Sequence, residues 1–322
     1  MERSKSDGPP RSTLERSSLF SRLAAGPISW GVCEVPGWGV MLTADRVLAE
    51  MASLGIAGTE LGAPGFLPSE PDALRAVLDR HGLRLAGAFL PVVMHDAAER
   101  EASISAARTA AALLEAAGGD GVLVSTAVVD LAWTTRRPLS SAEWQHLFAM
   151  LAELDDVAAT HGIVHALHPH TGTLVETRED VRSVLEGANV RWCLDTGHLL
   201  VGGYDPAVFA ADASGRVVHV HLKDVRTDVA AAYTKGEVNL VEAVQRGLFC
   251  PLGQGDAPVL ETVRRLEDDG YDGWYVLEQD TDLGPTEPVG AGPIDDVRLS
   301  VEFLHNELVS VSRASERSSR SR

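Results

Sequence analysis

Eight short apolar segments that favour β-strands alternate with longer segments of helical periodicity, and this alternation limits the fold more than any other feature. The strand segments are PISWGV (27–32), GTELG (58–62), RLAGAFLP (84–91), GVLVSTA (121–127), VHALHPH (164–170), VRWCLDTGH (190–198), VVHVHLKD (217–224) and GWYVLEQD (273–280). Strands that alternate with helices are typical of parallel sheets. Eight such units predict an α/β protein with a single (β/α)8 TIM barrel rather than an open sheet.

The segments between the strands carry apolar residues at helical spacing, and most end in glycine. In TADRVLAEMASLG, Thr43 is a candidate N-cap, Val47 and Met51 share an apolar face, and Gly55 marks the end. The same pattern recurs over residues 71–82, 97–117, 141–162 and 257–270. The first strand is followed by no G-x-G-x-x-G, so we expect no nucleotide cofactor.

Two long segments lie outside a minimal barrel. Residues 226–257 form an insertion after the seventh strand, with one short helix expected, and residues 281–294 form a Pro- and Gly-rich loop after the eighth. Long loops on the carboxyl side of barrel strands are where such folds build their functional sites. We expect a barrel over residues 23–312 between disordered tails at 1–22 and 313–322.

Net charge, hydrophobicity and cysteine content indicate which partners and which cellular compartment to expect. The 322 residues carry a formal net charge of −18, which repels nucleic acid and anionic membranes. No apolar run approaches the roughly 18 residues of a membrane-spanning helix. Cys33, Cys193 and Cys250 are too few and too widely spaced for a disulfide framework, so we expect a cytoplasmic protein.

Polar side chains recur where the predicted strands end. They are Glu60, His168, His170, Asp195, His198, His221, Lys223, Asp224, Glu278 and Asp280. In a barrel the carboxyl ends of the strands meet at one mouth, so residues distant in sequence become neighbours. Each residue alone has a plain structural explanation, but together they would leave costly polar groups unpaired. A divalent cation, which takes mixed nitrogen and oxygen ligands, resolves this cost.

Alternation along the seventh strand separates its polar side chains from its apolar ones. His219, His221 and Lys223 share one face, and Val218, Val220 and Leu222 share the other, which must pack against helices. The first three therefore point into the barrel. His221 is high enough to bind a ligand, whereas His219 lies deeper and is expected to support it.

Several motifs in the same order resemble those of myo-inosose-2 dehydratases, which belong to the xylose-isomerase-like TIM-barrel superfamily. The motifs are PISWG, GTELG, HPHTGT, CLDTGH, HVHLKD, GLFCPLGQGD and GYDGWYVLEQD, within residues 27–305. The resemblance implies one divalent ion, manganese or cobalt first and magnesium or zinc as alternatives. Its implied ligands are His168, Asp195, His221 and Glu278.

One departure favours a dehydratase over an epimerase. Many isomerases of the superfamily carry a glutamate at the end of the fifth strand, where this chain has His168-Pro169-His170. Without that glutamate, epimerisation by two carboxylates on opposite faces of the substrate is disfavoured. The resemblance then implies metal-assisted removal of a proton beside a carbonyl, followed by loss of water, on a cyclic polyhydroxy ketone such as 2-keto-myo-inositol.

Candidates for proton transfer are Lys223, whose pKa a nearby cation would lower, His198 and Glu60. Trp30 and His170 are expected to contact the substrate. Lys223 could instead form a salt bridge with Asp224 or another acid at the rim. Trp30 could instead be an aromatic residue of the core. At the level of function, a sugar or cyclitol isomerase or epimerase on the same barrel stays open, as does a non-catalytic sugar-binding barrel. A homo-oligomer is possible.

Overall fold

The strands close into one parallel barrel, as the alternation predicts. A computed structural model describes residues 19–33, 35, 38–118, 120–288 and 290–319, with side chains up to Glu307. Eight parallel strands form the barrel in the order β1-β10-β7-β6-β5-β4-β3-β2. They are β1 Leu23–Ala25, β2 Gly58–Glu60, β3 Arg84–Val92, β4 Val122–Ala127, β5 Val164–Leu167, β6 Trp192–Asp195, β7 Val217–Leu222 and β10 Trp274–Leu277.

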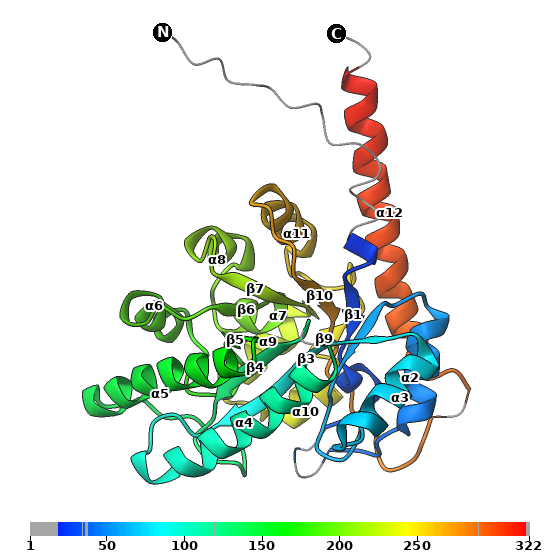
Figure 1. Ribbon diagram of the computed structural model, residues 1–322. Helices are drawn as coiled ribbons and strands as arrows, with labels where there is room; N and C mark the ends of the chain where they lie inside the picture. The colour runs from blue at the N-terminus through cyan, green and yellow to red at the C-terminus, as the bar shows by residue number, and fades with distance from the viewer. Residues whose placement is uncertain (1–18, 34, 36–37, 119, 289, 320–322) are drawn as a thin grey trace, which may run out of the picture.

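Helices surround the strands (Figure 1). Those outside the insertion are α2 Ala44–Ser53, α3 Pro71–His81, α4 Arg100–Ala116, α5 Ser141–Thr160, α6 Arg178–Gly187, α7 Thr196–Val201, α8 Pro206–Asp212, α11 Val259–Asp268 and α12 Ile294–Ser319, with a short 3-10 turn, η2, at Ala97–Glu99. The sequence pattern predicts α2, α3, α4, α5 and α11, and their existence is confirmed. Local chemistry sets some of the starts: α5 begins at a capping box in which Ser140 and Glu143 satisfy each other's backbone N–H groups.

The first strand lies earlier than predicted. The predicted strand over residues 27–32 is wrong, because Pro27–Trp30 forms a 3-10 helix, η1, after the true strand β1. Pro27 lacks the N–H that a ladder in the barrel would need, and its fixed φ suits the first turn of a helix. Gly31, with φ of 79°, then ends the turn.

The insertion after β7 holds more structure than the one short helix predicted. It contains α9 Thr227–Thr234, α10 Leu240–Gln245, and the short strands β8 Asp224–Val225 and β9 Phe249–Cys250. The two strands pair antiparallel outside the barrel. Apolar side chains of the insertion, including Val225, Val244 and Phe249, form a small separate cluster.

One buried carboxylate ties this insertion to the barrel. Asp224 accepts hydrogen bonds from the backbone N–H groups of Val225, Gly253, Gly255 and Ala257 at 2.8 to 3.0 Å. A Cβ at Gly255 would lie 2.4 Å from Asp224 Oδ1, so only glycine permits this approach. The segment after β9 is therefore held against the end of β7.

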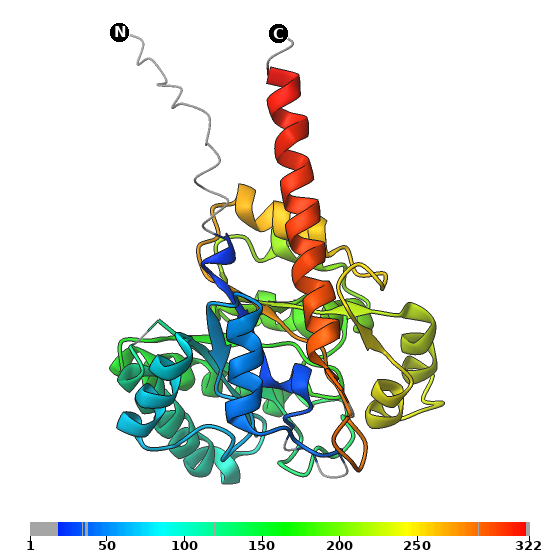
Figure 2. The same cartoon turned by 90° about the vertical axis from the view of Figure 1, so that its right-hand side faces the viewer.

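The two ends of the chain differ from the expected tails where they are described. Leu19 is buried and Arg22 pairs with Glu267 at 3.0 Å, so residues 19–22 pack onto the barrel. Helix α12 continues to Ser319, past the expected boundary at 312, and projects beyond the barrel in both views (Figures 1 and 2). The remaining tail residues, 1–18 and 320–322, lie outside the described part of the chain.

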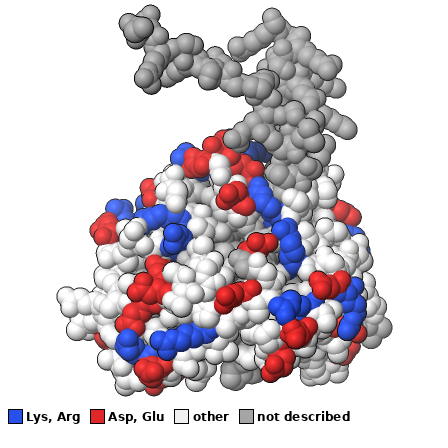
Figure 3. Space-filling model, viewed as in Figure 1, with Lys and Arg blue, Asp and Glu red and all other residues white. Residues whose placement is uncertain are grey.

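The described surface carries many charged side chains. Acidic and basic side chains lie close together over the face drawn in Figure 3. Within the described residues, no helix combines the length and the apolar character that crossing a bilayer requires.

A buried hydrogen-bond chain fastens α5 to the sheet. His165 on β5 lies between Ser125 on β4 and Asp155 on α5, with Nε2 2.7 Å from Ser125 Oγ and Nδ1 2.7 Å from Asp155 Oδ1. The three side chains have the order of a serine-protease triad. Ser125 is fully buried and lies outside the cavity at the barrel mouth, however, so the chain is structural.

We expect Ser125→Ala to lower the free energy of unfolding by about 1–3 kcal/mol, because it leaves a ring nitrogen of His165 buried without a partner. Urea denaturation measures this change. Thr109→Ala, which removes an exposed hydroxyl on α4, is the control and should change stability by less than about 0.5 kcal/mol. Equal effects of the two substitutions would contradict a structural role for the chain.

Candidate active site

A cavity of about 1690 Å³ lies at the carboxyl ends of the barrel strands. Its wall includes the strand-end side chains Glu60, His168, His170, Glu278 and Asp280. The loop after β4 and the insertion helices α9 and α10 supply further walls, with Trp133, Arg136, Tyr233 and Leu240 among them. The long loops therefore form the outer part of the cavity, as expected for this side of a barrel.

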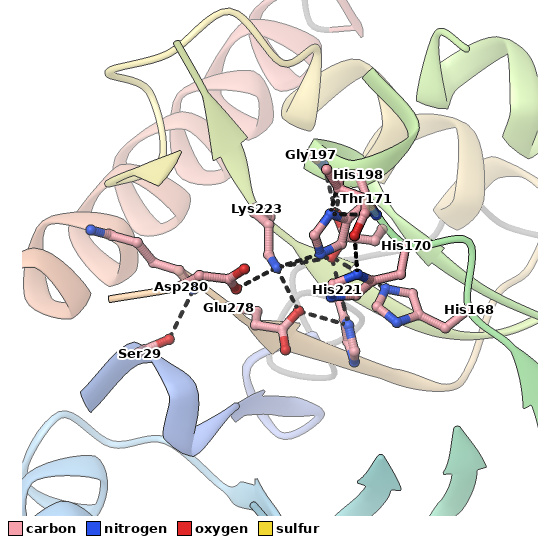
Figure 4. A network of polar contacts seen from close by, with 12 residues as sticks. Ser29, His168, His170, Thr171, Gly197, His198, His221, Lys223, Glu278 and Asp280 are labelled. Carbon is pink, nitrogen blue, oxygen red and sulfur yellow. Dashed lines mark hydrogen bonds and ion pairs between the residues drawn. The ribbon is translucent and has the colours of Figure 1, made fainter. Parts of the chain in front are cut away.

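Figure 4 shows the polar network at the inner end of the cavity, which includes His168, His221 and Glu278. His168 Nε2 lies 3.5 Å from Asp195 Oδ2, and His221 Nδ1 lies 3.7 Å from the same oxygen. His221 Nδ1 is also 2.9 Å from Glu278 Oε2. The structure thus brings together all four side chains that the resemblance names as ligands.

The same four atoms are buried without hydrogen-bond partners. His168 Nε2, Asp195 Oδ2, His221 Nδ1 and Glu278 Oε2 are each shielded from water, and none makes a hydrogen bond of acceptable geometry. Glu278 Oε2 does lie within ion-pair distance of His221 Nδ1 and of Lys223 Nζ, at 2.9 and 3.2 Å. Unpaired buried polar atoms are costly and uncommon in folded proteins. Two imidazole nitrogens and two carboxylate oxygens that converge in this way fit a divalent cation. Ligand atoms of His168, Asp195, His198 and Glu278 also lie within 4.8 Å of one another.

The Asp195-Thr196-Gly197 sequence explains how the carboxylate at the end of β6 is held in position. Asp195 Oδ1 caps helix α7 by accepting from the N–H groups of Gly197 and His198, which leaves Oδ2 for the site. Thr196 Oγ1 bonds the backbone of Lys223 on the next strand, at 2.7 and 2.9 Å. A Cβ at Gly197 would lie 2.7 Å from Lys223 Cγ, so glycine makes room for the lysine stem.

Glu60 lies beside the two histidines of β7. Its Oε1 is 2.8 Å from His219 Nε2 and 3.1 Å from His221 Nε2. A Cβ at Gly87 on β3 would lie 2.8 Å from the same oxygen, so the glycine leaves the room that the Glu60 carboxylate occupies. Burial would raise the pKa of Glu60, but His221 and His219 lower it below its usual range. Glu60 therefore accepts from the far nitrogen of His221 and turns Nδ1 toward the other three donor atoms.

Lys223 is buried behind the cavity wall rather than on it. Its Nζ lies 2.6 Å from Asp280 Oδ1, 3.2 Å from Glu278 Oε2 and 2.9 Å from His198 Nε2. Burial alone would lower the pKa of Lys223, but Asp280, Glu278 and Asp195 raise it. The amine is therefore an ammonium ion in this structure, and the expected salt bridge and the expected place beside the site are both present.

The two remaining histidines at the mouth are neutral. Burial lowers the pKa of His198 well below its usual value, and the neighbouring His170 and Lys223 lower it further. Burial and His168 together lower the pKa of His170 to about 3. His198 Nδ1 lies 2.8 Å from Thr171 Oγ1, and His170 Nδ1 lies 2.8 Å from the carbonyl oxygen of Thr171.

Trp30 does not contact the cavity, which corrects the expectation that it forms a substrate wall. It is fully buried in the main hydrophobic core, and its indole N–H donates to Glu50 Oε2 at 2.7 Å. The shift of β1 explains the error, because residues 27–30 form a 3-10 helix and Trp30 is turned away from the barrel mouth. The alternative of a core position is confirmed.

Sequence reasoning placed Asp280 at a strand end but gave it no role, and it did not single out Phe89 and Trp133, which also line the cavity. Asp280 is two positions past Glu278, and its partner Lys223 lies 57 residues earlier, so their pairing could not be read from the chain. Phe89 and Trp133 form an aromatic wall beside His170, with ring centroids of Phe89 and Trp133 6.5 Å apart. Trp133 has φ of 58°, the only positive value of a described non-glycine residue, and this unusual backbone is invisible in sequence.

Fold and site together define a TIM barrel whose mouth holds clustered histidines and carboxylates. The chain belongs to the xylose isomerase-like TIM barrel family, whose profile it matches over residues 48–306.

Individual relatives extend this match over nearly the whole chain. The inosose dehydratase of Geobacillus kaustophilus (strain HTA426) is 31% identical over 302 residues, which cover 90% of this chain and 96% of that protein. The rhizopine catabolism protein MocC of Rhizobium meliloti is 33% identical over 294 residues, which cover 88% and 89%. The solved structure of the probable 3-DHS dehydratase AsbF from Bacillus anthracis has a TM-score of 0.62 at 16% identity, covering 88% and 98%, and supports the fold alone.

We expect Glu60→Gln to weaken binding of Mn²⁺ by about 10- to 100-fold, because carboxylates that orient a metal-binding histidine contribute on that scale. Calorimetric titration of the metal-free protein measures the dissociation constant. Glu302→Gln, on the exposed side of α12, is the matched control and should leave it unchanged. An unaltered dissociation constant for Glu60→Gln would show that Glu60 does not orient His221.

Proposed function

We propose that this protein is a divalent-metal-dependent dehydratase of a cyclic polyhydroxy ketone such as 2-keto-myo-inositol. The observation that carries the proposal is the set of four clustered, buried donor atoms at the mouth of the barrel that make no hydrogen bond. The inosose dehydratase that is 31% identical over 90% of the chain supports the reaction class. The cavity of about 1690 Å³ beside the donor atoms has ample room for a six-membered ring.

His168, Asp195, His221 and Glu278 would hold the ion. Manganese and cobalt suit two imidazoles and two carboxylates, and magnesium and zinc are alternatives. When bound, the ion supplies Lewis-acid polarisation of the substrate carbonyl, which acidifies the neighbouring C–H. Glu60 and His219 contribute by holding His221 in the tautomer that presents Nδ1.

We assign proton transfer at the substrate to Asp280, with Lys223 as its positioning residue. Asp280 borders the cavity, and burial raises its pKa to about 6, against the opposing effect of Lys223. A carboxylate with a pKa this close to neutral is suited to accept the C–H proton and return it to the departing hydroxyl. Lys223 holds the carboxylate at 2.6 Å and is itself bonded to His198. This assignment replaces Glu60, whose Oε1 is engaged by two histidines.

His170 and the aromatic wall would bind the ring. Because His170 Nδ1 lies against a backbone carbonyl, its Nε2 remains an acceptor for a substrate hydroxyl. Phe89 and Trp133 offer flat apolar surfaces to the C–H face of the ring. A homo-oligomeric assembly stays a prediction, as does a place in the cytoplasm, which the three free cysteines support.

The competing function is an isomerase or epimerase of a keto-sugar or cyclitol on the same metal site. Proton exchange at the carbon beside the carbonyl is common to both reactions, whereas loss of water belongs to the dehydratase alone. The histidine at position 168 favours the dehydratase, because a two-carboxylate epimerase needs a second acid–base carboxylate there.

We expect the manganese-loaded protein to convert 2-keto-myo-inositol in deuterated water with release of water and formation of an unsaturated or diketone product. His221→Ala and Glu278→Gln should lower kcat/KM by at least about 1,000-fold, since each removes a metal ligand and an interaction with developing charge. Mass spectrometry of the product and its deuterium content provides the measurement.

Glu302→Gln serves again as the control and should retain full activity. Exchange of deuterium without loss of water would support the isomerase instead. Full activity of either site variant would exclude the site as assigned here.

We expect Lys223→Met to shift the acidic limb of the pH profile of kcat/KM to higher pH. Lys223 lowers the pKa of Asp280, so removal of its charge lets burial raise that pKa above about 6. The base is then protonated, and activity lost, at a higher pH than in the unaltered enzyme. Lys223→Arg, which keeps the charge, should shift the limb less. A limb that stays in place in Lys223→Met would remove Asp280 from the proton-transfer role.

A further inference from the structure

Cys193 lies inside the barrel, directly below the proposed metal ligands. It precedes Asp195 by two residues on β6, so both side chains point to the interior. The barrel register places Cys193 beside His219 and Asp195 beside His221. Cys193 is fully buried among the interior side chains Val122, Val124 and Ala166. Neither the proposed reaction nor the packing of helices on the barrel uses its sulfur.

Two nearby imidazoles have nitrogen atoms that make no hydrogen bond, although carboxylates lie near them. Both ring nitrogens of His168 and Nδ1 of His221 are buried without hydrogen-bond partners. One nitrogen of each ring and Cys193 Sγ all lie within 4.8 Å of one another. A single ion between them can therefore contact one sulfur and two nitrogens.

We propose that Cys193, His168 and His221 form a second metal position, which overlaps the catalytic one and takes thiophilic ions such as Zn²⁺ and Cd²⁺. The proposal rests on the proposed function, because it shares His168 and His221 with the catalytic set. A thiolate with two imidazoles is a donor set that these soft or borderline ions prefer. Manganese and magnesium prefer oxygen ligands and remain with Asp195 and Glu278.

The two positions exclude each other. Both positions draw on the rings of His168 and His221, and two divalent ions this close together inside the barrel would repel each other strongly. A thiophilic ion is therefore a competitive inhibitor with respect to the activating ion. When it binds, the Cys193 S–H bond breaks, the sulfur–metal bond forms, and the proton passes to buffer. No electron is transferred.

The first test is titration of the metal-free, full-length protein with Cd²⁺ alone, followed by ultraviolet absorption. We expect a sulfur-to-cadmium charge-transfer band that saturates at one equivalent. Cys193→Ser should lack the band and bind Cd²⁺ at least about tenfold more weakly, because even residues behind a metal ligand contribute 10- to 100-fold. Cys250→Ser, which alters the other buried cysteine, is the matched control and should keep the band.

Glu278→Gln separates the two positions. It should retain the cadmium band, because the thiophilic position does not use Glu278, while it binds Mn²⁺ at least about tenfold more weakly. Equal weakening of both ions would overturn the separate position.

A second measurement needs no variant and so does not depend on whether Cys193→Ser folds. X-ray absorption at the metal edge of the unaltered protein should detect one sulfur neighbour around cadmium and none around manganese. Cadmium with only nitrogen and oxygen neighbours would overturn the proposal, as would a charge-transfer band that persists in Cys193→Ser.

The outcome is distinguishable from that of the proposed function. A manganese-loaded protein that dehydrates the ketone but gives no cadmium band would overturn the thiophilic position alone. A protein that gives the band but has no dehydratase activity with manganese would support the position and overturn the function.

Discussion

Four buried donor atoms without hydrogen-bond partners at the mouth of the barrel are the constraint on which the rest of the site depends. None of them makes a hydrogen bond, so their contacts are ion-pair contacts with one another and with Lys223 in a low-dielectric interior, where burying so many polar groups is costly. Neighbouring residues are arranged to hold that costly geometry: Asp195 caps a helix with its other oxygen, and Glu60 bonds the outer nitrogen of His221. Under the proposed function, a bound ion would offset this cost only when all four donors converge, and folding would then be linked to metal binding.

The side chains next to the four donor atoms balance the charge at the mouth of the barrel. Lys223 sits among three carboxylates, and its charge keeps Asp280 from becoming a neutral acid in spite of burial. The neutral histidines His170 and His198 complete the mouth without adding positive charge to it. Through Lys223, the charge of Asp280 is therefore coupled to those of Asp195 and Glu278.

Much of this was predictable from sequence, and the failures have physical causes. Period-two alternation and glycine-ended helices predict the barrel, and strand seven is oriented correctly because one apolar face must pack against helices. Trp30 was misassigned because Pro27 converts a strand-like segment into a turn. The role of Asp280 and the place of Trp133 could not be predicted, because both depend on contacts between segments distant in sequence, and these follow no period. The extra helix in the insertion was missed since short helices rely on tertiary contacts.

The attachment of the insertion has a consequence for how this barrel can change. Asp224 holds four backbone N–H groups, and the residue before it is Lys223. The carboxylate therefore fixes the end of the insertion, at residues 253–257, directly beside the lysine of the polar network. A change at Asp224 or Gly255 would thus reach both the wall of the cavity and the position of Lys223, although neither residue lines the cavity.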